Sequence, residues 1–201
     1  MARKAAARPH DAKLAIVEAA MRLAAERSWR DIALADIAAA AGLGVVELYR
    51  LLPSKPAILQ EFTRRIDLAA LSEAVDPVER PRDRLFEILM RRFDALGPYK
   101  PALRRMAGDA RKLGLDLLPA AIQLPRSMSW MLEAAHIPSA GFVGAVRAKA
   151  LCFAYLAVLR TYLDDDSPDL TRTMAALDRA LRRAEPFMRL SDAPGAEADA
   201  A

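Results

Sequence analysis

Apolar residues recur every three to four positions along most of this chain, which is the spacing of helices with one buried face. The first stripe of this kind predicts a helix over about residues 11–27 and consists of Leu14, Val17, Met21 and Ala24. Alanine and leucine supply much of the apolar material, whereas runs of valine, isoleucine and threonine are few and no asparagine-glycine turn occurs. We therefore expect an all-α protein.

Two short helices are predicted next, over 34–41 and 45–51, separated by Gly42, where a left-handed turn is easiest. Ser54 is expected to cap a longer helix that follows them. Pro56 fits the first turn of that helix because the amide at this position has no helical partner. The pattern therefore predicts a helix-turn-helix between two supporting helices.

Prolines interrupt the pattern beyond this unit. Pro77 and Pro81 indicate a domain boundary near residue 74, and the nearly all-apolar segment 140–163 predicts a long buried helix. Asp166 is expected to start the last helix, because it precedes a serine-proline pair. The sequence thus predicts four segments. A flexible basic arm (1–10) precedes a helix-turn-helix domain (11–56), which helix 54–73 links to the rest of the chain. A helical body (74–190) and a disordered tail (191–201) follow.

The net charge of +4 suits an anionic partner but does not identify one. Arg3, Lys4 and Arg8 make the amino end basic, whereas the last eleven residues carry only acidic charges. The single cysteine, Cys152, lies in an apolar run, which excludes an internal disulfide and fits a reducing compartment. Because the first residues also lack the apolar core of a secretory signal, a cytoplasmic location is expected.

Neither membrane insertion nor catalysis is predicted. The longest uninterrupted apolar stretch, 150–159, would extend about 15 Å as a helix, roughly half of a bilayer core, so no transmembrane segment is expected. An enzyme needs a nucleophile with its base, paired carboxylates or a metal cluster, yet His10, His136 and Cys152 are the only imidazole or thiol groups. We expect no enzymatic activity, no cofactor and no metal.

The run 42-GLGVVELYRLLPSK-55, preceded by 36-DIAAAA-41 and 16-IVEAAMRLAAERSW-29, resembles the N-terminal domain of the TetR family. The pattern shared with the family is alanine-glycine, a short helix with a tyrosine, then proline-serine-lysine. The resemblance implies a TetR-like fold of about nine helices, in which a three-helix DNA-binding module precedes a helical body for ligand binding and dimerisation. It also implies a homodimer whose recognition helices enter successive major grooves of double-stranded DNA, about 34 to 36 Å apart.

By this resemblance Tyr49 and Lys55 stand where the family contacts phosphate. The start of a helix carries free amides and a partial positive charge, which gives Lys55 a physical reason for that role. Arg50 and the basic arm would add salt-dependent contacts to the DNA backbone. The predicted DNA-binding residues are Arg3, Lys4, Ala33, Gly44, Val45, Val46, Glu47, Tyr49, Arg50 and Lys55.

The chain also departs from the family pattern. The family commonly has serine, a basic residue, glycine or alanine, and threonine where this chain has Gly44, Val45, Val46 and Glu47. Ala33 replaces the usual capping hydroxyl residue, and Leu51 and Leu52 replace a histidine-phenylalanine pair. Glu47 can accept a hydrogen bond from cytosine but repels phosphate, and valines read little besides the thymine methyl group. The recognition helix therefore either binds DNA or has become a packing element.

The body has a second resemblance, over about residues 82–186, to the C-terminal domain of the Coq9 family of ubiquinone-biosynthesis accessory proteins. It rests on 85-LFEILMRRFDALGPYKPALRR-105, 127-SMSWMLEAAHI-137 and 164-DDDSPDLTRTMAALDRALRR-183. That family binds isoprenoid lipid, so the resemblance implies a hydrophobic pocket and an alternative function, a lipid-binding accessory protein with a vestigial DNA module. The membrane-docking helix of that family has no counterpart in 191–201, which lacks an apolar face.

Two sets of body residues are candidates for binding. Aromatic and methionine side chains adapt to apolar guests, although the same spacing also fits an ordinary core, and the candidate pocket residues are Phe86, Met90, Phe93, Met128, Trp130 and Met131. By the TetR resemblance the dimer interface would contain Leu151, Tyr155, Leu159, Tyr162, Leu170, Leu177 and Leu181. The leading prediction is a dimeric one-component regulator whose affinity for operator DNA depends on a small apolar ligand.

Overall fold

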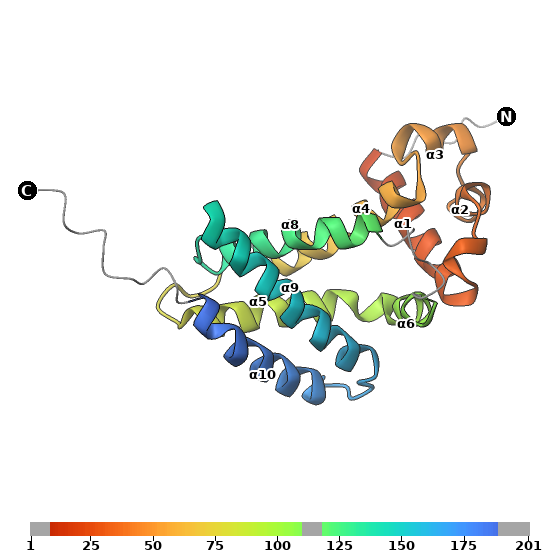
Figure 1. The fold of residues 1–201 in the computed structure, drawn as a ribbon. Helices are drawn as coiled ribbons and strands as arrows, with labels where there is room; N and C mark the ends of the chain where they lie inside the picture. The colour runs from red at the N-terminus through yellow and green to blue at the C-terminus, as the bar shows by residue number, and fades with distance from the viewer. Residues whose placement is uncertain (1–8, 110–117, 189–201) are drawn as a thin grey trace, which may run out of the picture. The chain divides into compact units, whose positions relative to one another are not determined.

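The computed structural model describes residues 9–109 and 118–188, which form helices joined by short connections (Figure 1). No strand occurs in either stretch, so the predicted all-α class is confirmed. Within these stretches the chain forms two compact units, the first from 9–69, 94–109 and 118–123, the second from 70–93 and 124–188. The functional domains predicted from the sequence stay a prediction, because the two units describe packing alone.

The helices at the amino end belong to the first unit. They are α1 (Pro9–Glu26), the 3₁₀ turn η1 (Trp29–Asp31), α2 (Leu34–Ala40), α3 (Val45–Leu51) and α4 (Lys55–Ala70). All four α-helices begin within two residues and end within three residues of their predicted positions, because their apolar stripes and end signals agree. The Ser54 side chain accepts a hydrogen bond from the Ala57 amide at 3.2 Å, so the predicted cap of α4 is confirmed. The largest fully buried side chains of these elements are Ile16, Trp29, Ile37, Leu48 and Ile58.

The remaining helices are α5 (Pro81–Leu96), η2 (Gly97–Tyr99), α6 (Lys100–Gly108), α8 (Leu118–Ala134), α9 (Gly141–Leu163) and α10 (Thr171–Met188). The long helix predicted over 140–163 is confirmed as α9, which packs against α10 in the second unit (Figure 1). The last helix, however, begins at Thr171 and not at Asp166. The predicted start was wrong because Asp166 and the serine-proline pair form a turn that precedes the helix.

Asp165 organises that turn. Its carboxylate is fully buried and accepts hydrogen bonds from the Thr173 amide and hydroxyl, at 2.8 and 2.7 Å, and from the amide and hydroxyl of Ser167. Burial alone would raise the pKa of Asp165, but the hydrogen bonds from Ser167 and Thr173 outweigh burial and lower it. Asp165 is therefore an ionised group that satisfies the Thr173 amide in the first turn of α10.

Aromatic rings and one arginine hold α5 to α9 inside the second unit. The Phe93 ring stacks on Tyr155 with a centroid distance of 5.3 Å and lies 4.9 Å from the Tyr162 ring. The buried Arg92 donates a hydrogen bond to the Tyr155 hydroxyl at 2.6 Å and to the Ser127 hydroxyl at 3.2 Å. These contacts fill the face of α9 that carries Tyr155 and Tyr162.

Cys152 is buried on the same helix. Burial raises the pKa of its thiol to about 11, although the charge of Arg92 acts in the opposite direction. At neutral pH the thiol is therefore protonated.

Helix α9 is long and apolar enough to cross a membrane, by length and composition alone. The uninterrupted apolar stretch considered in the sequence analysis is shorter than this helix and did not indicate it. A single helix of this kind is weak evidence for a span, because the core helices of soluble domains have the same composition.

Lys55, the first residue of α4, closes the turn between α1 and α2. Its ammonium group donates hydrogen bonds to the main-chain oxygens of Trp29, Ile32 and Arg30, at 2.5, 3.0 and 3.3 Å. The same nitrogen lies 5.0 Å from the centroid of the Trp29 ring. An ammonium group has three donors, so these carbonyls use all of them. Lys55 thereby ties the start of α4 to the turn η1.

Helix α2 begins with only half of a capping box. The Asp36 carboxylate accepts hydrogen bonds from the Ala33 amide at 3.1 Å and from the Arg27 guanidinium at 2.8 Å. Ala33 has the extended conformation of an N-cap residue, with φ −82° and ψ 153°, but its methyl group cannot accept a hydrogen bond. The first amides of α2 therefore lack a side-chain acceptor at the N-cap position.

Replacing Lys55 by methionine should lower the free energy of unfolding by about 1.5 to 3 kcal/mol, the range for a hydrogen bond to a charged group. Urea titration followed by circular dichroism measures this loss. Arg50→Met serves as the control, because it removes a charge from an exposed position of the same unit. Wild-type stability in Lys55→Met would show that the carbonyl contacts are not needed for folding.

Replacing Ala33 by serine should raise the free energy of unfolding by about 1 kcal/mol, because the hydroxyl would cap α2. The matched control is Ala39→Ser, at an exposed position inside α2, where serine is a slightly worse helix former than alanine. Both variants are compared by thermal unfolding. A gain of equal size at Ala39 would contradict the capping explanation.

Candidate nucleic-acid interface

A sharp turn presents α3 on the surface of the first unit (Figure 1). Gly42, at φ +70°, has the left-handed conformation that ends α2, and the amides of Gly42 and Leu43 return to the carbonyls of Ala39 and Ala38 at 3.0 and 2.9 Å. Leu48 is the buried residue of α3. A helix held by one buried leucine leaves its other faces available for contact.

The predicted DNA-binding residues of α3 lie together on these exposed faces. Val45 and Val46 are each more than half exposed, and the Tyr49 side chain is 68% exposed. The remaining exposed members of the predicted set on or next to α3 are Gly44, Glu47 and Arg50. The surface thus combines two valines, whose side chains can pack against thymine methyl groups, with a phenol, a guanidinium and one carboxylate.

Leu52, one of the two leucines that depart from the family pattern, has a different environment. Its side chain is buried, whereas Leu51 is half-buried. Leu52 therefore contributes to the core of the unit, and this departure changes packing more than it changes the exposed surface of α3.

The phosphate role predicted for Lys55 is not supported by its contacts. Its donors are directed at the carbonyls of η1, so a phosphate would have to displace one of them. Sequence reasoning placed the lysine correctly at the start of α4, but the same lysine serves equally well as a cap for a preceding turn. The geometry shows a structural contact for Lys55, and its phosphate contact stays a prediction.

The other predicted contacts near α2 and at the amino end have mixed outcomes. Ala33 is exposed but has no polar side-chain atom. Arg3 and Lys4 lie outside the described residues, as does the predicted tail. Sequence reasoning missed Arg27, whose ion pair with Asp36 positions the start of α2. No motif in the sequence indicates this pair, because its members are nine positions apart.

The six predicted pocket residues do not share one environment. Phe93, Met128 and Met131 are fully buried and fill the core of the second unit, whereas Trp130 is 58% exposed. Phe86 and Met90 are half-buried. The set therefore combines core and surface residues in helical spacing, and a pocket shared by these six residues stays a prediction.

The residues predicted for the dimer interface lie mostly inside the second unit, and their role in a dimer stays a prediction. Five of them are buried within the second unit and so are not on its surface: Leu151, Tyr155, Tyr162, Leu177 and Leu181. Leu159 and Leu170 are half-buried. These residues were correctly expected to be buried, but on α9 they are covered by α5 and α10 of the same chain.

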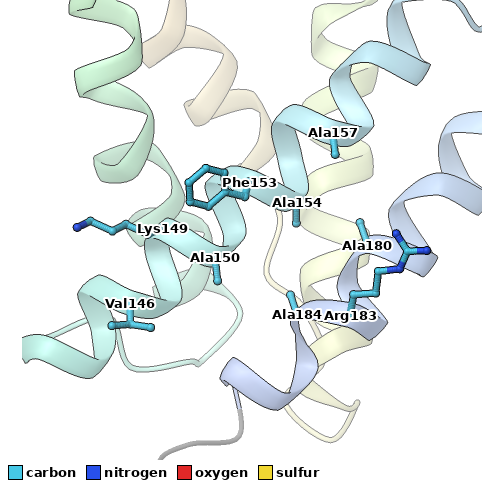
Figure 2. Close-up of a pocket in the computed structure, with 9 residues that line it drawn as sticks. All are labelled: Val146, Lys149, Ala150, Phe153, Ala154, Ala157, Ala180, Arg183 and Ala184. Carbon is cyan, nitrogen blue, oxygen red and sulfur yellow. The ribbon is translucent and has the colours of Figure 1, made fainter.

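The other face of α9 forms an open groove with α10, of about 470 Å³ (Figure 2). Its lining residues are Val146, Lys149, Ala150, Phe153, Ala154, Ala157, Ala180, Arg183 and Ala184. The alanine side chains are small and leave the groove open, and the Phe153 ring, which is 75% exposed, projects beside them. The sequence pattern did not identify this face as a surface, because alanines occur on both sides of an apolar helix and do not indicate which side is buried.

Comparison with known proteins identifies the first unit and the fold. Residues 16–62 match the family model described as bacterial regulatory proteins, tetR family. A search of curated proteins found no match.

Solved structures of TetR transcriptional regulators resemble the chain over most of its length. The regulator from Nitrosomonas europaea ATCC 19718 is 25% identical, with a TM-score of 0.67, over 86% of this chain and 97% of its own. The regulator from Rhodococcus sp. RHA1 is 21% identical, with a TM-score of 0.63, over 88% and 97%. One from Streptomyces coelicolor is 14% identical, with a TM-score of 0.56, over 90% and 88%.

These similarities confirm the predicted TetR-like fold. They do not show the resemblance of the body to the Coq9 family, which stays a prediction. The chain therefore has the fold of the TetR transcriptional regulators, and residues 16–62 match the model of the TetR-family N-terminal domain.

Proposed function

We propose that this chain is a TetR-type transcriptional regulator that binds operator DNA as a homodimer. The observation that carries the proposal is the exposure of Val45, Val46 and Tyr49 on one helix of a TetR-family domain. Large apolar and aromatic side chains gathered on a surface indicate a site of contact with another molecule.

In this proposal α3 lies in the major groove, which is wide enough to admit a helix. Val45 and Val46 would contact thymine methyl groups, and Glu47 would accept a hydrogen bond from a cytosine amino group. Tyr49 and Arg50 would bind phosphates and set the position of the helix without reading sequence. Because Lys55 is engaged with carbonyls, the salt dependence of binding would come from Arg50 and the basic arm and not from Lys55.

The groove between α9 and α10 is the proposed dimer interface. A two-fold axis would bring the same surface of both chains together, so the surface must be complementary to itself. The Phe153 ring projects beside a floor of small alanines, and it would fit the alanine floor of a second copy. A partner would also bury the exposed side of α9, a helix that is apolar on both sides.

Ligand control completes the proposal. A ligand held in the second unit would bind better to one arrangement of the dimer than to another, and it would shift the population by that difference in affinity. The separation of the two α3 helices, and hence operator affinity, would follow that shift.

Tyr49→Phe and Arg50→Ala should each weaken binding to DNA of every sequence. For Arg50→Ala the slope of log affinity against log salt should fall by about 1, because one phosphate contact is lost. Band shifts at two salt concentrations, with DNA from upstream of the protein's own coding region, measure both effects.

The control for this experiment is Arg179→Ala, which removes an equal charge from an exposed position on α10. A change of sequence preference in Tyr49→Phe would contradict its phosphate role. If the wild type gives no shift even at low salt, the regulator proposal fails and the lipid-binding alternative is favoured.

Phe153→Asp should dissociate the dimer without unfolding the chain. Burying a phenylalanine contributes about 1.5 to 3 kcal/mol and the symmetric interface loses two, so the dissociation constant should rise by about 10²- to 10⁴-fold. Sedimentation measures the association state, and circular dichroism checks the fold. Val78→Asp is the matched control, since Val78 is 90% exposed in the same unit but outside the groove. A dimeric Phe153→Asp variant would place the interface elsewhere.

A further inference from the structure

Arg147 is a buried cation of α9 with unused hydrogen-bond donors. Its side chain is 1% exposed, and its Nη1 donates to the main-chain oxygen of Pro138 at 2.8 Å. Its Nε and Nη2 have no hydrogen-bond partner in the part of the chain that the structure describes. A buried charge without an opposite charge is strongly unfavourable, and buried donors normally find acceptors.

A second buried arginine reaches the same connecting segment. Arg84 of α5 donates to the Ala135 oxygen at 2.7 Å and to the oxygens of Pro77 and Glu79. The acceptors of both arginines are therefore neutral carbonyls, which satisfy donors but do not cancel a charge. Two guanidinium groups thus converge on the connection between α8 and α9, and they make this part of the interior favourable for an anion.

The two unused donors of Arg147 have the geometry of a carboxylate site. Nε and Nη2 form one edge of the guanidinium plane, and this edge can hold both oxygens of a carboxylate at once. The same chain uses the same edge elsewhere: Nε and Nη2 of Arg64 bind the two oxygens of Glu61 at 2.9 and 2.8 Å.

We propose that Arg147 binds the carboxylate of a small organic acid, and that this acid is the ligand that controls the regulator. The proposal rests on the proposed function and specifies its ligand class. The positions one and two turns beyond Arg147 on α9 are Leu151 and Tyr155, both buried, and the Tyr155 hydroxyl accepts a hydrogen bond from Arg92. An apolar acid with one negative charge fits this environment better than a phosphate, because a second charge adds a large desolvation cost.

The connection between α8 and α9 is the route to Arg147. It runs from residue 135 to residue 140, and His136 within it and Gly141 directly after it have positive φ, at 56° and 69°. It packs closely against the first turn of α9. A Cβ atom added to Gly144 would lie only 2.0 Å from the carbonyl carbon of Ser139, so this contact requires glycine. A ligand enters by lifting this connection and, once bound, ties α9 to it through Arg147.

The test measures thermal unfolding of the full chain with acetate, benzoate, hexanoate and octanoate, and with the corresponding alcohols. An apolar acid at about a hundred times its dissociation constant should raise the melting temperature by roughly 5 to 11 °C. The alcohols, acetate and inorganic phosphate should give much smaller shifts. Equal shifts with octanoate and octanol, or with phosphate and octanoate, overturn the carboxylate assignment.

Arg147→Met should abolish the shift with the acids and leave the unliganded melting temperature unchanged or higher, because a buried unpaired charge is removed. Arg84→Met is the matched control and should lower it, because the donors of Arg84 are bound to carbonyls. Arg147→Lys keeps the charge but loses the planar edge, so it should bind the acids at least about tenfold more weakly. An unliganded Arg147→Met chain that melts lower and keeps the shift with the acids would show a purely structural arginine.

The two proposals fail in different ways. Wild-type protein that binds DNA but is stabilised by none of the acids overturns the inference about Arg147 alone. Unliganded protein that does not bind DNA at low salt overturns the proposed function.

Discussion

The first unit depends on the contact between the Lys55 ammonium and the carbonyls of the turn η1. A short 3₁₀ turn leaves most of its carbonyls without main-chain partners, and one lysine from a later helix donates to the carbonyls of Trp29, Arg30 and Ile32. The start of α4 is thereby fixed to the end of α1. The helices between these two points, α2 and α3, must fit within a closed loop of chain, which determines where α3 is presented.

The helices of this unit could be predicted from the sequence because several local signals agree. The stripe of α1, the left-handed Gly42 and the Ser54 cap each identify a boundary independently of the others. The role of Lys55 could not be predicted in the same way. A lysine at the start of a helix is compatible with a phosphate contact and with a carbonyl contact, and only the arrangement of the preceding turn distinguishes them.

In the second unit the sequence predicted the two last helices but not which of their faces contact other helices. Helix α9 is apolar on both sides, so periodicity gave the buried residues Leu151 and Tyr155 without indicating that α5 and α10 already cover them. Its opposite face is built mainly of alanines, whose small size carries little directional signal. The arginines inside the unit were missed for another reason: a basic residue in a helix is usually at the surface, and burial at Arg84, Arg92 and Arg147 results from tertiary contacts.

The position of Cys152 makes its thiol a natural probe for opening of the second unit. Its thiol is buried in α9 and protonated at neutral pH, so alkylating reagents reach a reactive sulfur only when this helix leaves the core. Because the chain has no other cysteine, the rate of modification reports the opening of the second unit without any engineered label. The same burial keeps the folded protein's thiol from reacting with peroxide, so this residue does not act as a peroxide sensor.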